Sequence, residues 1–191
     1  MSAVKILALS GSLQDESFNK RLLDRAVHFA REAGADVTSI KLEDFDLPLY
    51  SQDREMRAFP EDAKRLKALF CSHDAFLIAS PEHNGSITTA LKNAIDWVSR
   101  STDGEPPLAL TGFRGKVAGL MSASPSPFGG LRSLAHLRQI LTTVQTLVVT
   151  EQVSVTFAHT AFEGPELIDA IPNQLLPLLV KRVVQLAKVS A

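Results

Sequence analysis

The sequence predicts an α/β protein built on a doubly wound parallel sheet of five strands, in the order 2-1-3-4-5. Along the 191 residues, short apolar runs alternate about five times with segments of helical period. The clearest runs are apolar throughout, which is typical of a parallel sheet that helices cover on both faces. Right-handed crossovers leave few strand orders for such a chain, and this order is the commonest at this length.

Each element is expected from its own pattern of apolar residues. Strands are predicted at residues 4–9, 36–42, 74–79 and 116–121, with a fifth within 146–155. Helical spacing predicts helices at 17–33, 61–71, 87–100 and 131–141, and a final helix from about 165 to 188. Residues 43–60 contain two prolines and several acids without a sustained period, so we expect a long loop there.

The composition indicates an ordinary globular protein, with 45% hydrophobic and 21% charged residues. A formal net charge of −1 argues against nucleic acid or an anionic membrane as a partner. Cys71 is the only cysteine, which excludes an internal disulfide, and the histidines lack metal-ligand spacing, so we expect no metal site. No apolar run reaches about 18 residues and no secretion signal is recognisable. We expect one domain over residues 1–191, in the cytoplasm and not inserted in a membrane.

Three loops that each follow a predicted strand carry unusual chemistry. They span residues 10–19, 80–86 and 122–130. In a sheet of this order the first, third and fourth strands are neighbours, so these loops converge at the carboxyl edge, where open parallel sheets bind their ligands. The predicted strand order therefore places a binding site here.

The first loop has the chemistry of an anion site. It offers hydroxyls at Ser10, Ser12 and Ser17 and an amide at Asn19, directly before a helix whose free N–H groups favour phosphate. Gly11 is its only glycine, so it is neither a GxGxxG fingerprint nor a P-loop. The alternative is that Ser17 is only an N-cap and the other serines are turn residues.

The second loop contains residues that turn the chain tightly. Pro81, Asn84 and Gly85 would present consecutive backbone N–H and C=O groups, which suit the polar edge of a flat heterocycle. The alternative is a plain turn from strand to helix, with Ser86 or Thr88 as the cap. In the third loop, Gly129 and its neighbour permit close approach to a ligand, or form a flexible connection.

Two segments carry a family resemblance. GSLQDESFN, which begins at Gly11, and PEHNGSITTALKNAIDW, which spans residues 81–97, resemble the two signatures of the NADPH-dependent FMN reductase family. The segment DLPLYSQD at residues 46–53 is similar to a third stretch of that family. The resemblance implies a three-layer flavodoxin-like fold, in agreement with the strand order predicted above.

The resemblance also implies a cofactor and a reaction. FMN would be bound, with NADPH or NADH as co-substrate and a quinone, azo compound, free flavin or metal oxyanion as acceptor in a ping-pong cycle. The chemistry would reside at the flavin N5, and we name no catalytic side chain. The chain would form homodimers or homotetramers. The implied cofactor-binding residues are Ser10, Ser12, Gln14, Ser17, Asn19, Pro81, Glu82, His83, Asn84, Gly85, Ser86, Ser122, Ser124 and Gly129.

Three residues depart from the family pattern. Gln14 stands where many members have Arg, which removes a charged contact near the phosphate, although Lys20 or Arg21 could compensate. His83 replaces a tyrosine with a ring that can titrate near neutrality. Thr88 stands where proline is common, and either residue suits a helix start.

Two other classes of protein fit the sequence. A flavodoxin-like electron carrier would bind FMN without reacting well with NAD(P)H, but such carriers tend to be strongly acidic. A non-catalytic domain of the same fold would bind another phosphate ligand or a protein. Glu82 could likewise be an ordinary exposed carboxylate. We therefore expect an NAD(P)H-dependent FMN reductase and keep both alternatives for test.

Overall fold

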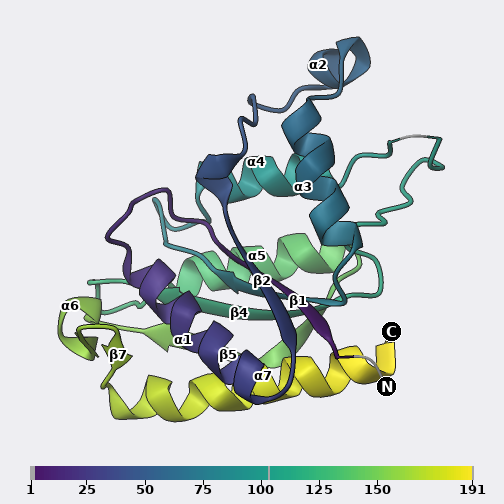
Figure 1. Cartoon of the computed structure of the whole chain (residues 1–191). Helices are drawn as coiled ribbons and strands as arrows, with labels where there is room; N and C mark the ends of the chain where they lie inside the picture. Colours follow the sequence, from purple (N-terminus) through teal and green to yellow (C-terminus); the bar gives the residue numbers. More distant parts are fainter. Residues whose placement is uncertain (1–2, 103, 191) are drawn as a thin grey trace.

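The computed structural model describes residues 3–102 and 104–190. Its main sheet has five parallel strands in the order β2-β1-β3-β4-β5 (Figure 1). The strands are β1 (Lys5–Ser10), β2 (Asp36–Lys41), β3 (Ala75–Ala79), β4 (Val117–Ala123) and β5 (Leu147–Val155). The predicted fold class and strand order are confirmed.

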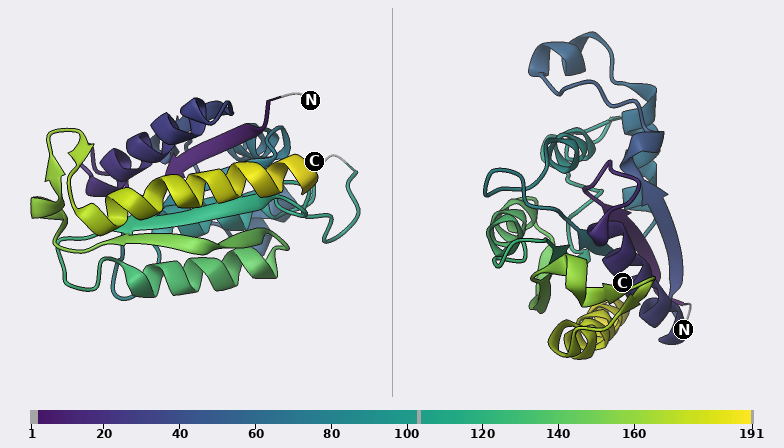
Figure 2. Two further views of the ribbon diagram at one scale, coloured as in Figure 1. Left: turned by 90° about the horizontal axis from the view of Figure 1, so that it is seen from below. Right: turned by 90° about the vertical axis from the view of Figure 1, so that its left-hand side faces the viewer.

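Helices cover both faces of this sheet (Figure 2). The layer on one face consists of α1 (Phe18–Glu32) and α7 (Ala170–Ser190), which pack against each other and against the strands. The layer on the other face consists of α3 (Glu61–Cys71), α4 (Thr89–Val98) and α5 (Leu131–Thr143). These layers explain why the central strands are apolar throughout and do not alternate.

The strand β1 shows how the two cores are divided. Ile6 and Ala8 face the core under α1 and α7, whereas Leu7 and Leu9 face the core under α3, α4 and α5. Successive side chains of a strand point to opposite faces, so a strand with both faces covered must be apolar at every position. The strand β1 therefore ends as a rigid, buried support for the first polar loop.

The first helix begins and ends where the sequence predicts. Ser17 is the N-cap, and its Oγ accepts a hydrogen bond from the Asn19 N–H at 3.2 Å. At the other end Gly34 adopts φ of 80°, and its N–H donates to the Arg31 carbonyl at 2.9 Å. These two caps fix the direction in which α1 leaves the first loop.

The segment at 43–60 is not a loop throughout, so this expectation was wrong. A short 3₁₀ helix η1 (Leu42–Asp44) opens it, and α2 (Gln52–Arg57) follows, with the Ser51 hydroxyl accepting from the Arg54 N–H at 3.3 Å. None of the α2 residues is buried. A helix without a buried face leaves no apolar period in the sequence, which is why the pattern did not reveal it.

The C-terminal region also differs from the expectation of one helix from about residue 165. The helix α7 begins at Ala170, and α6 (Ala158–Ala161) precedes it together with a two-stranded antiparallel ribbon. The ribbon pairs β6 (Phe162–Glu163) with β7 (Glu166–Leu167). Strands of two residues are too short to show an alternating pattern.

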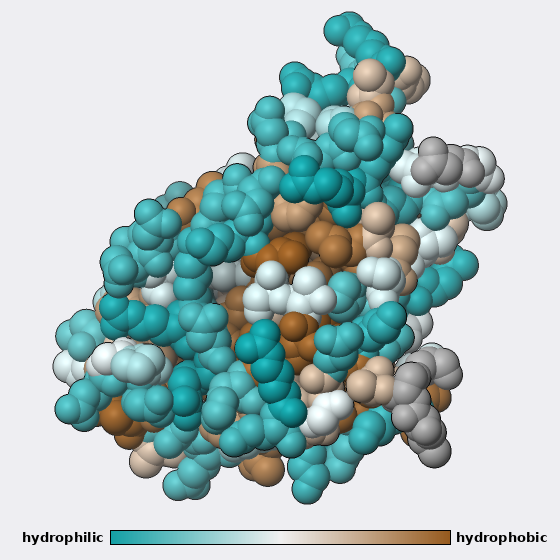
Figure 3. All heavy atoms as spheres, in the orientation of Figure 1, coloured by the Kyte–Doolittle hydropathy of each residue, from teal (hydrophilic) through white to brown (hydrophobic). Residues whose placement is uncertain are grey.

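Exposed large apolar side chains are spread over the described part of the chain. On the face drawn in the space-filling view, hydrophobic residues are visible near the middle, and hydrophilic residues surround them (Figure 3). The exposed large apolar residues include Leu49 and Met56 in the segment that leads to and through α2, and Ile171, Leu175 and Leu178 on α7. Within residues 3–102 and 104–190, no helix is both long and apolar enough to cross a membrane.

A buried lysine joins α3 to the connection between α4 and β4. Lys67 Nζ donates to the Arg100 carbonyl at 2.6 Å and to Thr102 Oγ1 at 3.0 Å, and it forms an ion pair with Glu105. Glu105 also accepts from the Thr111 hydroxyl at 2.6 Å. Burial raises the pKa of Glu105, but the hydrogen bonds from Lys67, Thr111 and Thr102 outweigh it and lower the pKa to about 2.

Substitution Lys67→Met should destabilise the fold by about 2 kcal/mol, because it leaves the Glu105 carboxylate without its cation. In the wild type, this pair makes its full contribution to the stability of the fold at pH values above the ordinary glutamate pKa of 4.5. The contribution is lost as the pH falls toward about 2. The variant should lose part of that acid dependence. Urea unfolding between pH 3 and pH 7 measures both effects.

The control is Lys92→Met, which breaks an exposed pair with Asp96 within α4. Its cost should be about 0.5 kcal/mol or less, with no new acid dependence. Equal costs for the two variants would contradict the structural role of Lys67.

Candidate functional site

The carboxyl ends of β1, β3 and β4 lead into a hollow of about 560 Å³. This volume lies within the range of about 300–1,000 Å³ that is usual for small-molecule sites. Eight predicted site residues line it: Ser12, Gln14, Ser17, Asn19, Pro81, Glu82, His83 and Ser124. Six predicted site residues lie outside its lining: Ser10, Asn84, Gly85, Ser86, Ser122 and Gly129. The three loops do converge.

The serines of the first loop are held by the backbone in a way that leaves their protons available. Ser10 Oγ accepts from the Ser12 N–H at 3.1 Å, and Ser12 Oγ accepts from the Gln14 N–H at 3.3 Å. Ser17 Oγ accepts from the Asn19 N–H, as described above. A hydroxyl that accepts a hydrogen bond still has one O–H to donate. Ser12 and Ser17 can therefore each donate to an anion in the hollow.

Asn19 joins the first loop to the end of β4. Its Nδ2 donates to the Ala123 carbonyl at 2.8 Å, and its Oδ1 accepts from the Ala123 N–H at 3.0 Å. Asn19 is 3% exposed, so this two-way contact is shielded from water. The side chain thus fixes the distance between two loops that line the hollow.

Thr88 joins the first loop to the start of α4. Its Oγ1 donates to the Gly11 carbonyl at 2.7 Å and accepts from the Leu91 N–H at 3.2 Å, which confirms Thr88 as the N-cap. A Cβ atom at position 11 would lie 3.1 Å from Thr88 Oγ1 and 3.2 Å from Leu91, so a glycine permits this close approach. One hydroxyl thus caps a helix and holds the first loop.

The second loop contains a tight turn, as predicted. His83 and Ser86 exchange backbone hydrogen bonds at 2.9 and 3.0 Å. Between them Asn84 and Gly85 have φ of 51° and 78°, as a two-residue reverse turn requires. The turn residues Asn84 and Gly85 do not line the hollow, whereas the preceding residues, Pro81 to His83, do.

Glu82 is not an ordinary exposed carboxylate, and this alternative was wrong. Its side chain is 6% exposed, and it forms an ion pair with Arg132 at the start of α5. Burial raises the pKa of Glu82, but hydrogen bonds from Arg132 and Ser133 and the guanidinium charge outweigh it and hold the pKa below its usual range. Glu82 is therefore charged at neutral pH.

The glycines of the third loop approach the neighbouring strands closely. A Cβ atom on Gly129 would lie 2.3 Å from Ser154 Oγ, and one on Gly130 would lie 1.9 Å from Ser122 Oγ. Ser122 is fully buried, and no partner of its hydroxyl is found in the described part of the chain. Ser124 Oγ donates to Ser126 Oγ at 3.1 Å. These close contacts constrain the backbone of the third loop. Of the predicted third-loop residues, Ser124 alone lines the hollow.

Sequence reasoning missed several residues of the lining. Leu13 and Phe18 belong to the first loop and the first turn of α1, while Thr89 and Ala90 begin α4. Leu13 is 56% exposed. An apolar residue within an otherwise polar loop is the signal that could have marked this position, because the loop gives it no core to enter.

The segment DLPLY is fastened to α4 beside this site. The Tyr50 N–H donates to Asn93 Oδ1 at 2.8 Å, and Trp97 Nε1 donates to the Pro48 carbonyl at 2.7 Å. The rings of Tyr50 and Trp97 meet edge to face at 5.1 Å. The third resembling stretch is thus held by two residues of the second signature.

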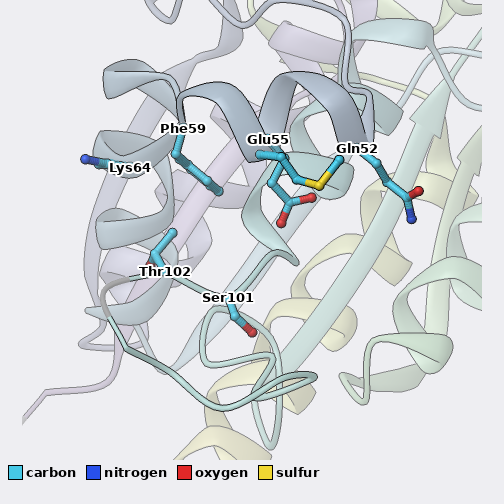
Figure 4. Close-up of a pocket in the computed structure, with 7 residues that line it drawn as sticks. Gln52, Glu55, Phe59, Lys64, Ser101 and Thr102 are labelled. Carbon is cyan, nitrogen blue, oxygen red and sulfur yellow. The ribbon is translucent and has the colours of Figure 1, made fainter.

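A second hollow, of about 720 Å³, lies away from the strand ends. Side chains of α2, of α3, of Phe59 between them and of residues 101–102 border it, among them Glu55 and Lys64 (Figure 4). It shares no lining residue with the hollow at the carboxyl edge. Phe59 packs on Trp97 at 5.3 Å and Glu55 accepts from the Tyr50 hydroxyl at 2.9 Å, so these two residues serve the packing of the long segment.

The cations nearest the first loop are already paired. Lys20 contacts Glu43 at 2.5 Å, and Arg21 contacts Glu16 at 3.1 Å. Across residues 3–102 and 104–190, no three histidine, cysteine, aspartate or glutamate side chains are grouped so as to hold a metal ion. The hydroxyls and backbone amides are therefore the groups that this loop offers to an anion.

The fold and the hollow define a flavodoxin-like protein with a candidate small-molecule site at the carboxyl edge of its sheet. The chain belongs to the NADPH-dependent FMN reductase family, whose sequence profile matches residues 4–160. Membership confirms the predicted class of enzyme, with FMN as cofactor and NADPH or NADH as co-substrate.

Individual relatives agree with this assignment. An NAD(P)H-dependent FMN reductase of Pseudomonas aeruginosa is 35% identical over 91% of this chain and 89% of its own length. An NADPH:quinone oxidoreductase of Arabidopsis thaliana is 33% identical over 95% of this chain and 87% of its own. The solved structure of FerB, a flavoenzyme NAD(P)H:acceptor oxidoreductase of Paracoccus denitrificans, covers 98% of this chain and 99% of its own with a TM-score of 0.82 and 26% identity.

A flavodoxin from an archaeon shares the fold alone. Its solved structure covers 97% of this chain and 99% of its own, with 11% identity and a TM-score of 0.60.

Substitution Thr88→Val keeps the shape of the side chain and removes both of its hydrogen bonds. We expect it to destabilise the fold by about 1–2 kcal/mol, because α4 loses its cap and the Gly11 carbonyl loses its donor. Thr88→Ser, which retains the hydroxyl, should cost much less. Urea unfolding of the two variants tests this, and equal losses would contradict the dominant role of the hydroxyl.

Proposed function

We propose that this chain transfers electrons from NADPH or NADH, by way of FMN bound in the hollow, to a quinone, an azo compound, free flavin or a metal oxyanion. The observation that carries the proposal is the convergence of both motif loops on one hollow of suitable size. NAD(P)H-dependent reductases acting on flavin and quinones among the relatives support it.

The residues present fit FMN. We assign the phosphate to the first loop, where the hydroxyls of Ser12 and Ser17 have protons to donate and the N-terminus of α1 favours negative charge. We assign the edge of the ring system to the backbone of residues 81–83. The remaining predicted binding residues, including Ser10, Ser122 and Gly129, would act indirectly, because their contacts constrain the conformation of these loops.

Bound FMN supplies the chemistry of accepting a hydride from the nicotinamide and passing electrons on. The chain contributes binding, orientation and electrostatics. We propose that donor and acceptor use the open side of the hollow in turn, in a ping-pong cycle, because the sequence contains no GxGxxG fingerprint that would hold a second nucleotide.

A quinone is the acceptor that we favour. Relatives at 33% identity in Arabidopsis thaliana and 35% identity in Escherichia coli are named as quinone reductases. The apolar side chains at the mouth of the hollow, such as Leu13, suit a flat apolar ring better than an oxyanion.

We further propose that the chain works in the cytoplasm as a single domain and forms a homodimer or homotetramer. Leu13, Leu49 and Met56 are 56%, 69% and 77% exposed, and side chains of this kind are commonly covered in an assembly. Analytical ultracentrifugation of the purified chain tests the assembly, and a monomer at micromolar concentration would contradict it.

Anaerobic reduction separates the candidate functions. Protein loaded with FMN should bleach on addition of NADPH or NADH, and a quinone added afterwards should restore the yellow colour. Yellow protein that neither nicotinamide bleaches would favour an electron carrier and contradict the reductase. A colourless preparation that gains no FMN on titration would contradict both, and would favour a non-catalytic domain.

Substitution Ser12→Asp should weaken FMN binding at least about tenfold, because a carboxylate would replace a donor beside the phosphate. Fluorescence titration of the apoprotein with FMN measures the Kd. Ser39→Asp is a control with the same change of charge on the exposed edge strand β2. An unchanged Kd in Ser12→Asp, or an equal loss in the control, would contradict the placement of the phosphate.

A further inference from the structure

The helix α5 begins without a capping side chain of its own. Its N-cap residue is Gly130, in the left-handed conformation with φ of 81°. A Cβ atom here would lie 1.9 Å from the hydroxyl oxygen of Ser122, so a serine or aspartate cap has no room. The Leu131 N–H donates to the Phe128 carbonyl at 3.0 Å, but the next amide groups of α5 need an acceptor from elsewhere in the chain.

Glu82 in the second site loop supplies this acceptor. Its Oε2 accepts from the backbone N–H groups of Arg132 at 3.1 Å and Ser133 at 3.3 Å. Its Oε1 accepts from Arg132 Nε at 2.6 Å, and the Arg132 Nη2 completes the ion pair. The partners lie about 50 residues apart in sequence, so the contact links two loops of the site. Both carboxylate oxygens are used by α5.

A second contact joins the same loop to the next turn of α5. His136 Nδ1 forms a hydrogen bond with Ser86 Oγ at 2.9 Å. Between the two contacts, His83 and Ser86 exchange backbone hydrogen bonds. The loop is therefore fastened to α5 at both ends, and its first residues face the hollow.

We propose that Glu82 and Arg132 are positioning residues of the flavin site. The carboxylate holds the loop at 81–86 in its binding conformation, and the guanidinium cancels the charge of that carboxylate beside the flavin. This inference rests on the proposed FMN site and deepens it, because it assigns the Glu82 side chain to α5 and not to the ligand.

The charge of this pair bears on the balance between oxidised and reduced flavin. Reduced flavin can carry a negative charge that oxidised flavin lacks on its ring, so an uncompensated carboxylate nearby would disfavour the reduced form. With Arg132 in place the pair is neutral. Removal of Glu82 and removal of Arg132 should therefore have different consequences for the bound flavin, and variants of the two residues can be compared.

Four variants separate holding the loop from balancing the charge. Glu82→Gln should weaken FMN binding about tenfold, because the loop loses its charged anchor. Arg132→Met leaves the carboxylate unpaired and should weaken reduced FMN about tenfold more than oxidised FMN, which lowers the two-electron potential by about 30 mV. The double variant should regain the wild-type potential while its affinity stays low. Arg132→Lys should keep the potential and lose affinity.

The control is an ion pair of the same kind outside the site. Arg182 Nε donates to Glu151 Oε1 at 2.8 Å between α7 and β5, and neither residue lines the hollow. Glu151→Gln and Arg182→Met should leave the FMN Kd and the potential unchanged. In the FMN-free protein, the backbone amides of His83 and Ser86 should exchange with solvent about tenfold faster in Glu82→Gln than in Glu151→Gln.

The inference is overturned if Glu82→Gln has the FMN Kd and the amide exchange of the wild type. It is also overturned if Arg132→Met and Arg182→Met shift the potential equally. A wild-type chain that binds no FMN would contradict the proposed function instead. The exchange measurement needs no FMN, so it would still show whether Glu82 holds the loop.

Discussion

The two hydrogen bonds between the Asn19 side chain and the backbone of Ala123 join the start of α1 to the end of β4. The order of the strands makes these ends neighbours, but the loops beyond them could still diverge. Thr88 adds a tie from the start of α4 to the Gly11 carbonyl, and Glu82 adds one from the second loop to α5. The hollow depends on these three ties, each between residues far apart in the sequence.

Local hydrogen bonds explain why so many small polar residues precede α1. Ser12 and Ser17 accept from nearby backbone amides, which fixes the oxygen atoms while leaving the hydroxyl protons to donate. A loop arranged in advance loses little entropy when an anion binds. Beneath it β1 is buried on both faces, so the anchoring point does not move. Rigidity of the sheet and polarity of the loop together support the proposed phosphate site, where the neighbouring cations Lys20 and Arg21 are already paired.

The predictable parts of this molecule are those with a local signal. The apolar strands and the helix caps at Ser17 and Thr88 follow from patterns within a few residues, and the convergence of the loops follows from strand order. The helix α2 buries nothing and the ribbon β6–β7 pairs only two residues on each side, so neither leaves a pattern. The partner of Glu82 is Arg132, 50 residues away, and no local sequence spacing predicts such a contact.

Two of the residues that depart from the family pattern, Thr88 and Gln14, differ in what they offer to the first loop. Thr88 replaces a proline, which could begin a helix but could not donate to the Gly11 carbonyl. Gln14 is exposed at the rim of the hollow, where it offers a neutral donor in place of a guanidinium. Lys20 and Arg21 could replace that charge only by giving up Glu43 and Glu16, which offsets part of the gain. In the proposed site, binding of the phosphate would therefore fall chiefly on the hydroxyls and amides of the first loop, and the tie from Thr88 would matter more than it would beside an arginine.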